Sequence, residues 1–482
     1  MAGQVNPTPT FALQPSAQQV VTQANYMTDF SFINQYLPDT YEKEFERYGN
    51  RTVASFLRMV GAEMPCNSDL IKWAEQGRLH QKYLGCTLGS HTGAETVQTI
   101  TIPKAQMIPA NGNVAIRVGQ TIMLSDEAAG SSFSNKAIVT GVTLSAAGVN
   151  DTIAVAYYEA TQAAYPVGAS VSIFIYGSEF NKGAVGMSGS NEADDIILDN
   201  KPIIIKDLYE VSGSDMAQIG WIEVTTENGA TGYLWYLKSE HEARLRFEDY
   251  LETAMVEAVP AAAASGVSAL AANNAAGLGT QGSKGLFYEV GQRGNVYGGG
   301  NPTTLADFDS VIQRLDKQGA IEENVIFVNR DFSFDIDDML AAQNSYGAGG
   351  TSYGLFDNDE DMALNLGFSG FRRGYDFYKT DWKYLNDPTM RGDIQGGKIN
   401  GILVPAGSTT VYDQILGKNA KRPFLHVRYR ASETEDRRYK TWITGGAGGA
   451  ATSGVDVMQV NFLSERALVT LGANNFFLFQ EA

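Results

Sequence analysis

A histidine–glutamate pair in a charged stretch is the first pattern that could carry chemistry. His241 and Glu242 begin the H-E-x-x-H motif, in which two histidines four residues apart bind one zinc ion from the same helix face. The position four residues after His241 is Leu245, which has no lone pair to offer. The other histidines make no such spaced pair; they are His80, His91 and His426. The sequence therefore predicts no zinc site, and we interpret the stretch as a structural helix.

That helix is expected from about Tyr233 to Val259, because Pro260 cannot continue it. It would be about 40 Å long at 1.5 Å per residue, which is long for a globular domain. Apolar residues at spacings of three and four form one stripe: Ala243, Phe247, Tyr250, Leu251, Ala254 and Ala258. Acid-first pairs four residues apart support it; they are Glu240 with Arg244 and Glu242 with Arg246.

Two glycine-rich stretches resemble nucleotide-binding loops without completing the pattern. In Gly277–Lys284 the serine precedes the lysine, and the stretch follows an Ala/Gly/Asn-rich link, where a phosphate loop needs a buried strand. Gly291–Gly294 and Gly298–Gly300 lack a strand-to-helix crossover around them. We expect a flexible link and no nucleotide site.

The acidic stretch Asp357–Asp361 resembles the start of a calcium-binding loop. Its sixth position is Met362 where glycine is needed, and its twelfth is Phe368 where the bidentate glutamate belongs. We interpret it as an acidic surface loop, with a weak cation site as the alternative. A second acidic cluster, Arg330–Asp338, is expected to turn its aromatic residues inward and its carboxylates to solvent.

Three short basic patches are mixed with acids and are interpreted as ordinary surface charge: Arg372–Arg373, Lys421–Arg422 and Arg437–Lys440. A serine or cysteine nucleophile needs a general base close in space, and no linear pattern nominates one. The sequence therefore assigns no catalytic, cofactor-binding or metal-binding residue, and it predicts that the protein is not an enzyme.

Composition narrows the class further. The 482 residues suffice for two to four compact units, and 44% are hydrophobic. A formal net charge of −18 argues against sequence-independent DNA binding, which needs clustered cations. The two cysteines, Cys66 and Cys86, are expected to be reduced and semi-buried. The first twenty residues lack a basic start and an apolar core, and no run of about 18 apolar residues occurs, so we expect synthesis in the cytoplasm.

The N-terminal half changes character near Val97. Residues 1–25 indicate an extended arm, Tyr41–Met59 a helix, and a stretch beginning near Asp69 a second helix capped by Asn67 or Ser68. From Val97 to Tyr176 the apolar residues alternate, as in Thr152–Tyr157 and Val171–Tyr176, with turn residues between. This pattern predicts a small β-barrel or sandwich inserted into the chain.

The C-terminal part reads as an α/β region. Thr303 or Thr304 is positioned to cap a helix that Gly319 ends. Strands are predicted in this region at Asn324–Val328, Ile402–Val404, Phe424–Tyr429 and Phe476–Phe479, and one more, Pro202–Ile205, is predicted before the long helix.

This layout resembles the major capsid protein of tailed bacteriophages, with the Hong Kong 97-type fold. Particular stretches are similar to the crAss-like phage branch: "KPIIIKD" (Lys201–Asp207), "SGSDMAQIGWIEV" (Ser212–Val224), "GLFYEVGQRGN" (Gly285–Asn295) and "NFLSERALVTLGANNFFLF" (Asn461–Phe479). The resemblance covers most of the chain.

The resemblance implies an α+β fold with six parts. These are an N-terminal arm (1–60), a helical segment and the start of an extended loop (61–103), a β-rich, barrel-like insertion (104–180), the return of the extended loop (181–232), a spine helix (233–259), and peripheral and axial domains (260–482).

It also implies a structural virion protein, made in the bacterial cytoplasm, that assembles into the hexamers and pentamers of an icosahedral head. Its partners would be other copies of itself and scaffold, portal and decoration or head-fibre proteins. The shell would enclose double-stranded DNA without sequence-specific binding, and no membrane partner is implied. The alternative is another virion component, such as a tail-tube or decoration protein.

Overall fold

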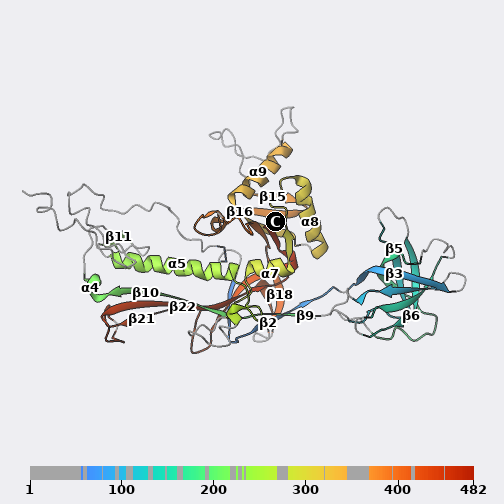
Figure 1. The fold of residues 1–482 in the computed structure, drawn as a ribbon, viewed down its shortest axis with the longest axis horizontal. Coiled ribbons are helices and arrows are strands. Elements are labelled where there is room, and N and C mark those ends of the chain that lie inside the picture. The colour runs from blue at the N-terminus through green and yellow to red at the C-terminus, as the bar shows by residue number, and fades with distance from the viewer. Residues whose placement is uncertain are drawn as a thin grey trace, which may run out of the picture. The chain divides into compact units, whose positions relative to one another are not determined.

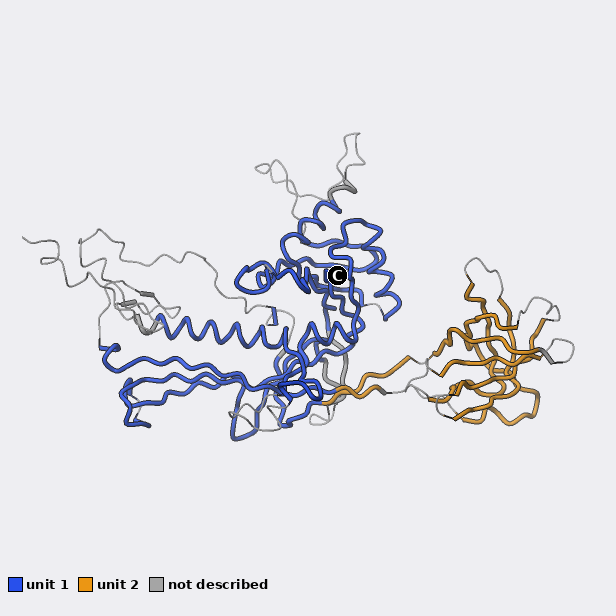
Figure 2. The backbone as a smooth tube through the Cα atoms, viewed as in Figure 1, with its two compact units in different colours: residues 1–71, 199–482 blue, residues 72–198 orange. Residues whose placement is uncertain are grey.

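The protein is a mixed α/β chain that divides into two compact units, residues 1–71 with 199–482 and residues 72–198 (Figure 2). The computed structural model describes residues 56–57, 62–78, 80–92, 97–104, 112–128, 134–146, 149–159, 167–189, 195–217, 224–225, 231–232, 235–268, 281–319, 321–344, 369–392, 394–413, 418–449 and 451–481. Except for Phe56 and Leu57, the predicted arm and first helix lie outside these residues.

Residues 72–198 contain a closed six-stranded barrel in the order β3-β4-β7-β6-β5-β8. Its strands are β3 (Lys82–Thr92), β4 (Val97–Ile102), β5 (Gln120–Asp126), β6 (Ser134–Thr143), β7 (Asp151–Tyr157) and β8 (Ser170–Ser178). Alternate residues fill the interior, as in β7, where Ile153 and Val155 are buried. The barrel therefore starts at Lys82, earlier than the predicted residue 104, because β3 and β4 complete it.

The helix predicted near Asp69 is wrong. That stretch forms β2 (Ile71–Gln76), which pairs with β9 (Asp195–Asn200). Burial in β2 alternates with period two, and the Trp73 Nε1–H donates to Glu75 two residues on, at 3.3 Å. Side chains two residues apart share one face of a strand but not of a helix, so the apolar residues fit a strand.

In the larger unit, one long helix covers a long sheet that is antiparallel except for the parallel pair of β1 and β20 (Figure 1). The helix is α5 (Trp235–Glu257), and the sheet order is β1-β20-β22-β10, with β21 also pairing with β22. The strands are β1 (Ala62–Cys66), β10 (Ile203–Ser212), β20 (Leu425–Arg430), β21 (Lys440–Gly445) and β22 (Val457–Thr470). Gly445 is required where β21 ends, because a Cβ there would lie 1.9 Å from the Val457 carbonyl oxygen.

The predicted stripe on α5 is largely confirmed. Ala243, Phe247 and Leu251 are buried against Val460 and Phe462 of β22. Tyr250 is 45% exposed, contrary to the prediction, because it lies beside the stripe and not within it. Of the predicted ion pairs, Glu240–Arg244 forms at 3.2 Å.

The charges around Glu242 and Arg246 pair differently from the prediction. Glu242 lies 3.8 Å from Lys238, and Arg246 lies 3.6 Å from Asp207 on β10. The tertiary partner on β10 thus replaces the expected pair along the helix.

A six-stranded mixed sheet completes this unit, in the order β13-β23-β17-β14-β16-β15. Its strands are β13 (Asn295–Tyr297), β14 (Glu323–Val328), β15 (Gly370–Arg373), β16 (Tyr375–Asp381), β17 (Ile399–Pro405) and β23 (Phe477–Gln480). Its helices are α7 (Leu286–Arg293), α8 (Leu305–Gln318), α9 (Arg330–Asn344) and α10 (Lys383–Asn386). The predicted cap Thr304 and stop Gly319 of α8 are confirmed.

The remaining short elements are the helix α4 (Gly213–Met216), the 3-10 turn η5 (Ala473–Asn475) and the strand pairs β11 (Val224–Thr225) with β12 (Thr231–Gly232) and β18 (Ser408–Asp413) with β19 (Lys418–Pro423). Within the described ranges, no helix combines the length and apolarity needed to cross a membrane.

Candidate functional site

Of the two patterns that resemble metal-binding motifs, the structure describes the one at His241. His241 lies on α5, and the described part of the chain holds no group of three His, Cys, Asp or Glu residues that could bind a metal ion. The acidic stretch Asp357–Asp361 lies outside the described residues, so its cation site remains untested.

The loop that resembled a phosphate cradle instead ties strands together where it is described. The Ser283 hydroxyl and the Lys284 N–H donate to Asn200 Oδ1 at 3.1 and 2.8 Å, and Lys284 Nζ lies 2.7 Å from Asp199 Oδ1. Asn200 Nδ2 in turn donates to the Leu468 carbonyl at 2.7 Å. The Lys284 ammonium thus forms an ion pair with a carboxylate of this chain, where a phosphate loop would offer it to a phosphate.

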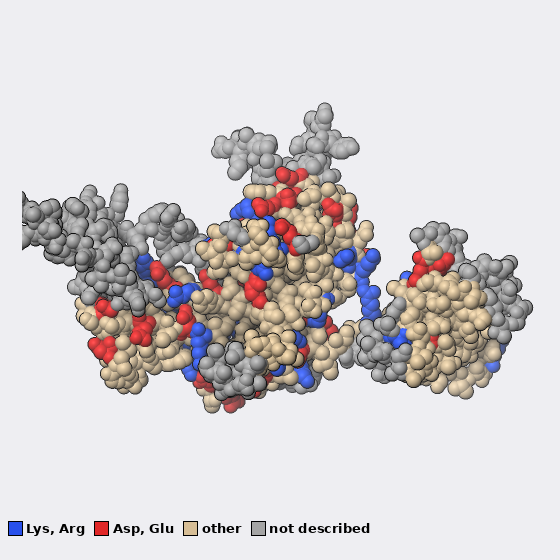
Figure 3. Space-filling view, viewed as in Figure 1, with Lys and Arg blue, Asp and Glu red and all other residues tan. Residues whose placement is uncertain are grey.

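Two of the predicted basic patches, Arg372–Arg373 and Arg437–Lys440, form ion pairs within the chain. Arg373 pairs with Asp309, Arg437 lies 2.8 Å from Glu465, and Lys440 lies 2.5 Å from Glu435. On the face drawn in Figure 3, cations and anions are interspersed.

In the acidic cluster Arg330–Asp338, Phe332 is buried as predicted. Phe334 is 56% exposed, so the expectation that both aromatic residues pack inward is wrong for Phe334. The Phe334 ring lies instead against the Arg330 guanidinium, whose central carbon is 6.0 Å from the centre of the ring.

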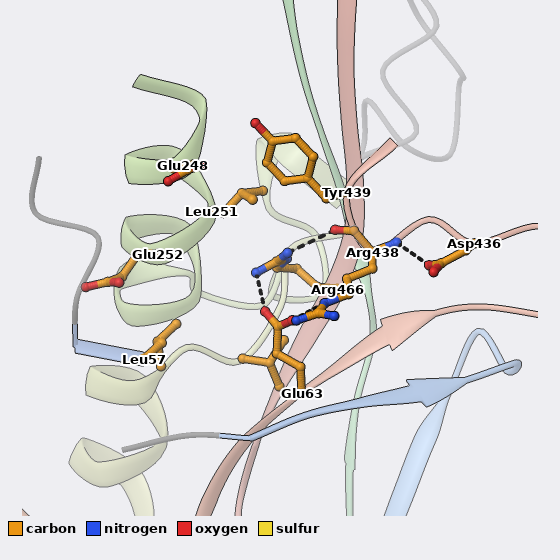
Figure 4. Close-up of a pocket in the computed structure, with 10 residues that line it drawn as sticks. Leu57, Glu63, Glu248, Leu251, Glu252, Asp436, Arg438, Tyr439 and Arg466 are labelled. Atoms are coloured by element: carbon orange, nitrogen blue, oxygen red, sulfur yellow. Dashed lines mark hydrogen bonds and ion pairs between the residues drawn. The ribbon is translucent and has the colours of Figure 1, made fainter. Parts of the chain in front are cut away.

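The most developed polar site is a junction between β1, α5 and β22, which we call the ionic junction (Figure 4). It encloses a cavity of about 650 Å³. Its lining residues come from five segments: Leu57, Glu63, Glu248, Leu251, Glu252, Val427, Asp436, Arg438, Tyr439 and Arg466. In Figure 4, Glu63 faces two arginines, while Glu248, Leu251 and Glu252 line the α5 wall.

Glu63 joins two arginines that come from the other end of the chain. Arg438 donates to Glu63 Oε2, and Arg466 NH1 lies 3.4 Å from Glu63 Oε1. The Glu63 carboxylate raises the pKa of Arg438 above its ordinary value through this hydrogen bond and its charge. Arg466, whose side chain is 7% exposed, also donates to the Arg438 carbonyl at 3.0 Å and to Ser464 Oγ at 2.9 Å. A buried guanidinium is tolerated because its donors are used.

The N-terminal segment enters the core beside this junction. The Phe56 N–H donates to Glu252 Oε1 of α5 at 3.0 Å. The Phe56 ring stacks on Trp382 with centroids 4.4 Å apart and meets Phe327 edge-on at 4.5 Å. Aromatic pairs of this geometry add to the burial of apolar area. Phe56 is thereby fixed to both α5 and the mixed sheet.

The carboxyl end of α5 is held by a second polar cluster. Glu257 accepts hydrogen bonds from the Tyr384 hydroxyl at 2.7 Å and from Arg391 Nε at 2.5 Å. Burial, followed by the Glu257 hydrogen bond, raises the pKa of Tyr384 above its ordinary value. A carboxylate near the carboxyl end of a helix is unfavourable for the helix dipole, and the Arg391 cation offsets this.

These clusters connect segments and place no nucleophile beside a base. The Glu63 ion pairs join β1 to β22 and to the segment before β21, while α5 is held by the hydrogen bond from Phe56 to Glu252 and by the Glu257–Arg391 ion pair. Glu63, Glu252 and Arg466 were not predicted as site residues. The one available signal was the charged Glu465–Arg466 pair inside an otherwise apolar strand pattern.

Comparisons with known proteins gave matches among solved structures alone. No protein-family model matches the chain, and no curated protein is similar to it in sequence. A structure from Microbacterium phage Oxtober96 is 10% identical, with a TM-score of 0.38 over 92% of this chain and 97% of that one. The capsid of a native GTA particle is 9% identical, with a TM-score of 0.37 over 93% and 96%.

A third solved structure, the holo-SrpI encapsulin complex from Synechococcus elongatus PCC 7942, is 12% identical, with a TM-score of 0.31 over 60% of this chain and 77% of that one. Because these three TM-scores are below 0.5, we base the function proposed below on this chain's own elements.

Proposed function

We propose that this protein is the major capsid protein of a tailed bacteriophage, of the Hong Kong 97-type fold and the crAss-like branch. The observation that carries the proposal is the combination of α5, laid along the sheet of β10 and β22, with a closed barrel inserted between β2 and β9 in the same chain. This is the order of elements that the sequence resemblance implies: insertion, returning strand, long helix, then mixed α/β region.

Each part has a role in this proposal. Residues 1–60 are the N-terminal arm, α5 is the spine helix, and residues 260–482 supply the peripheral and axial domains. The barrel of β3 to β8 is the insertion carried by the extended loop, with residues 181–232 as the loop's return. The ionic junction joins β1 to β22, and the hydrogen bond from Phe56 to Glu252 holds the spine helix beside it.

Charge is consistent with a container for nucleic acid. With a formal charge of −18, the protein has no excess of cations to hold DNA tightly, so packaged double-stranded DNA would remain free to move. Strength in such a shell comes from many modest contacts closed by symmetry, as hexamers and pentamers supply. Scaffold, portal and decoration or head-fibre proteins are the partners that this role would require.

Light scattering coupled to size-exclusion chromatography tests the proposal. We expect masses at five or six times the 52.1 kDa of one chain, or far larger particles, as the concentration rises. A mass of one chain at every concentration, unchanged by co-expressed scaffold, would contradict self-assembly. Open tubes of indefinite mass would favour the tail-tube alternative.

A further inference from the structure

The strand β10 lies at one end of the long sheet. It pairs with β22 on one side, and among the described residues no strand pairs with its other side. Burial alternates along it: Ile205 and Tyr209 pack toward α5, whereas Ile204 and Leu208 are 54% and 47% exposed. A free edge of ten residues is a template for strand addition.

Two hydrogen bonds show which backbone groups of β10 face outward. The Leu208 N–H donates to the side chain of its neighbour Asp207, at 2.9 Å, and not to the backbone of β22. Glu465 of β22, which lies opposite Ile204, donates its N–H to the Arg437 carbonyl on the other side of β22, at 3.0 Å. Because antiparallel strands use alternate residues on each side, the even-numbered residues of β10 present their N–H and C=O groups to the open edge.

That constraint limits how β10 can pair with a second β10. In an antiparallel pair the even-numbered residues must face even-numbered residues, since only these can exchange hydrogen bonds across the edge. If the two-fold axis passes through Lys206, Asp207 or Glu210, that residue faces the same residue of the second copy. Each of these three registers therefore places two like charges opposite each other. Centring the pair on Leu208 places Leu208 against Leu208, and Lys206 against Glu210 twice. Opposite charges directly across a sheet stabilise it and like charges destabilise it.

We propose that β10 is a two-fold self-association edge, at which two copies join antiparallel about Leu208 into one continuous sheet. The occupant is a second copy of this chain because the edge is complementary to itself: Lys206 faces Glu210 and Glu210 faces Lys206, as a two-fold axis demands. The Leu208 N–H would exchange its Asp207 acceptor for the carbonyl of Leu208 in the second copy. The choice of a second copy rests on the proposed self-assembly, and the register rests on β10 alone.

Charge exchange at this edge, followed by sedimentation equilibrium of the full chain at low salt, tests the register. We expect Lys206→Glu and Glu210→Lys each to raise the dissociation constant of the dimer that this edge forms, whether its halves are single chains or preformed pentamers and hexamers, at least about tenfold, since each places two like-charge pairs across the edge. The double variant K206E/E210K should restore the dimer, because both pairs are opposite in charge again. Lys182→Glu, the same charge change on the separate unit, should have no effect.

A backbone variant tests the edge itself. Leu208→Pro removes an N–H that β22 does not use, and proline is accepted on an edge strand with its nitrogen facing solvent. We expect L208P to retain the wild-type circular dichroism spectrum and to lose the dimer. A wild-type chain that stays monomeric, single variants that dimerise normally, or a double variant that stays weak would each overturn the proposal. Closed shells seen by electron microscopy for the single variants or for L208P would show that the edge inference had failed and the capsid function had not.

Discussion

The backbone N–H of Phe56 donates to Glu252 Oε1 across 196 residues of sequence, at 3.0 Å, and so ties Phe56 to the C-terminal part of the long helix. Both groups are buried, so each depends on the other for its hydrogen bond. Substitution of Glu252 therefore tests how strongly Phe56 is anchored to α5.

Replacing Glu252 with alanine should loosen the segment. The Phe56 N–H would lose its acceptor, at a cost of about 1–3 kcal/mol in the free energy of local opening. Hydrogen-exchange mass spectrometry should show faster exchange at residues 56–57 and along α5. Glu252→Gln, which retains an oxygen acceptor, should change exchange less. Glu240→Ala, which removes an exposed ion pair of α5, should cost no more than about 0.5 kcal/mol. Equal exchange in E252A and E240A would contradict the anchoring role.

The five-stranded sheet should weaken as the pH falls from 7.5 to 5. Burial lowers the pKa of His426 to about 4, so the folded chain keeps this imidazole neutral while the unfolded chain protonates it below about pH 6.5. The unfolded state then binds the extra proton, and stability should fall by about 2 kcal/mol over this interval. Thermal unfolding of the chain as a function of pH measures the loss, and His426→Gln should remove this part of it. A pH dependence identical in H426Q would contradict the assignment to His426.

Inside the barrel, Lys104 and Asp151 form an ion pair at 3.3 Å with side chains 3% and 0% exposed. Burial alone would raise the pKa of Asp151, but hydrogen bonds from the Ser145 and Val114 N–H groups and from Lys104 outweigh it and lower the pKa below its ordinary value. The carboxylate therefore stabilises the barrel above about pH 5, and this contribution declines as the pH falls below about 4.

Asp151→Ala should lower the free energy of unfolding of the barrel by about 3–5 kcal/mol. The substitution leaves the buried Lys104 ammonium without its anion and two backbone N–H groups without their acceptor. Lys104→Met should cost less, because the two N–H donors still hold the carboxylate. Hydrogen exchange of β3 to β8 reports both variants. A larger loss in K104M than in D151A would contradict this account.

The Cys86 thiol should be nearly inert in the folded barrel. Burial, with a smaller contribution from Glu127, raises its pKa to about 12. Because the thiolate is the reactive form, modification at pH 8 should be about a thousandfold slower than for a free cysteine. Thiol titration with a chromogenic disulfide measures the rate, and denaturant should restore it. Rapid labelling of Cys86 in the native protein would contradict its burial.

Local patterns allowed much of this fold to be predicted. The cap Thr304 and stop Gly319 delimit α8, and the apolar spacing around Phe247 identifies the buried face of α5. The stretch near Asp69 was wrongly predicted to be a helix because its apolar residues fit both the helical period of 3.6 and the strand period of 2 over so short a run. These residues are Leu70, Ile71, Trp73 and Ala74.

The ionic junction could not be predicted from sequence, since Glu63 meets Arg438 and Arg466 across 375 and 403 residues. No local period reports contacts over such separations. Likewise, the start of the barrel at Lys82 depends on β3 closing against β8, a pairing set by topology and not by composition.

Electron microscopy of the purified full-length chain, alone and with a co-expressed scaffold, tests the central claim most directly. The account predicts closed polyhedral shells, or isolated pentamers and hexamers. A chain that remained monomeric in both preparations, or that formed only open tubes or sheets, would contradict the proposed capsid function.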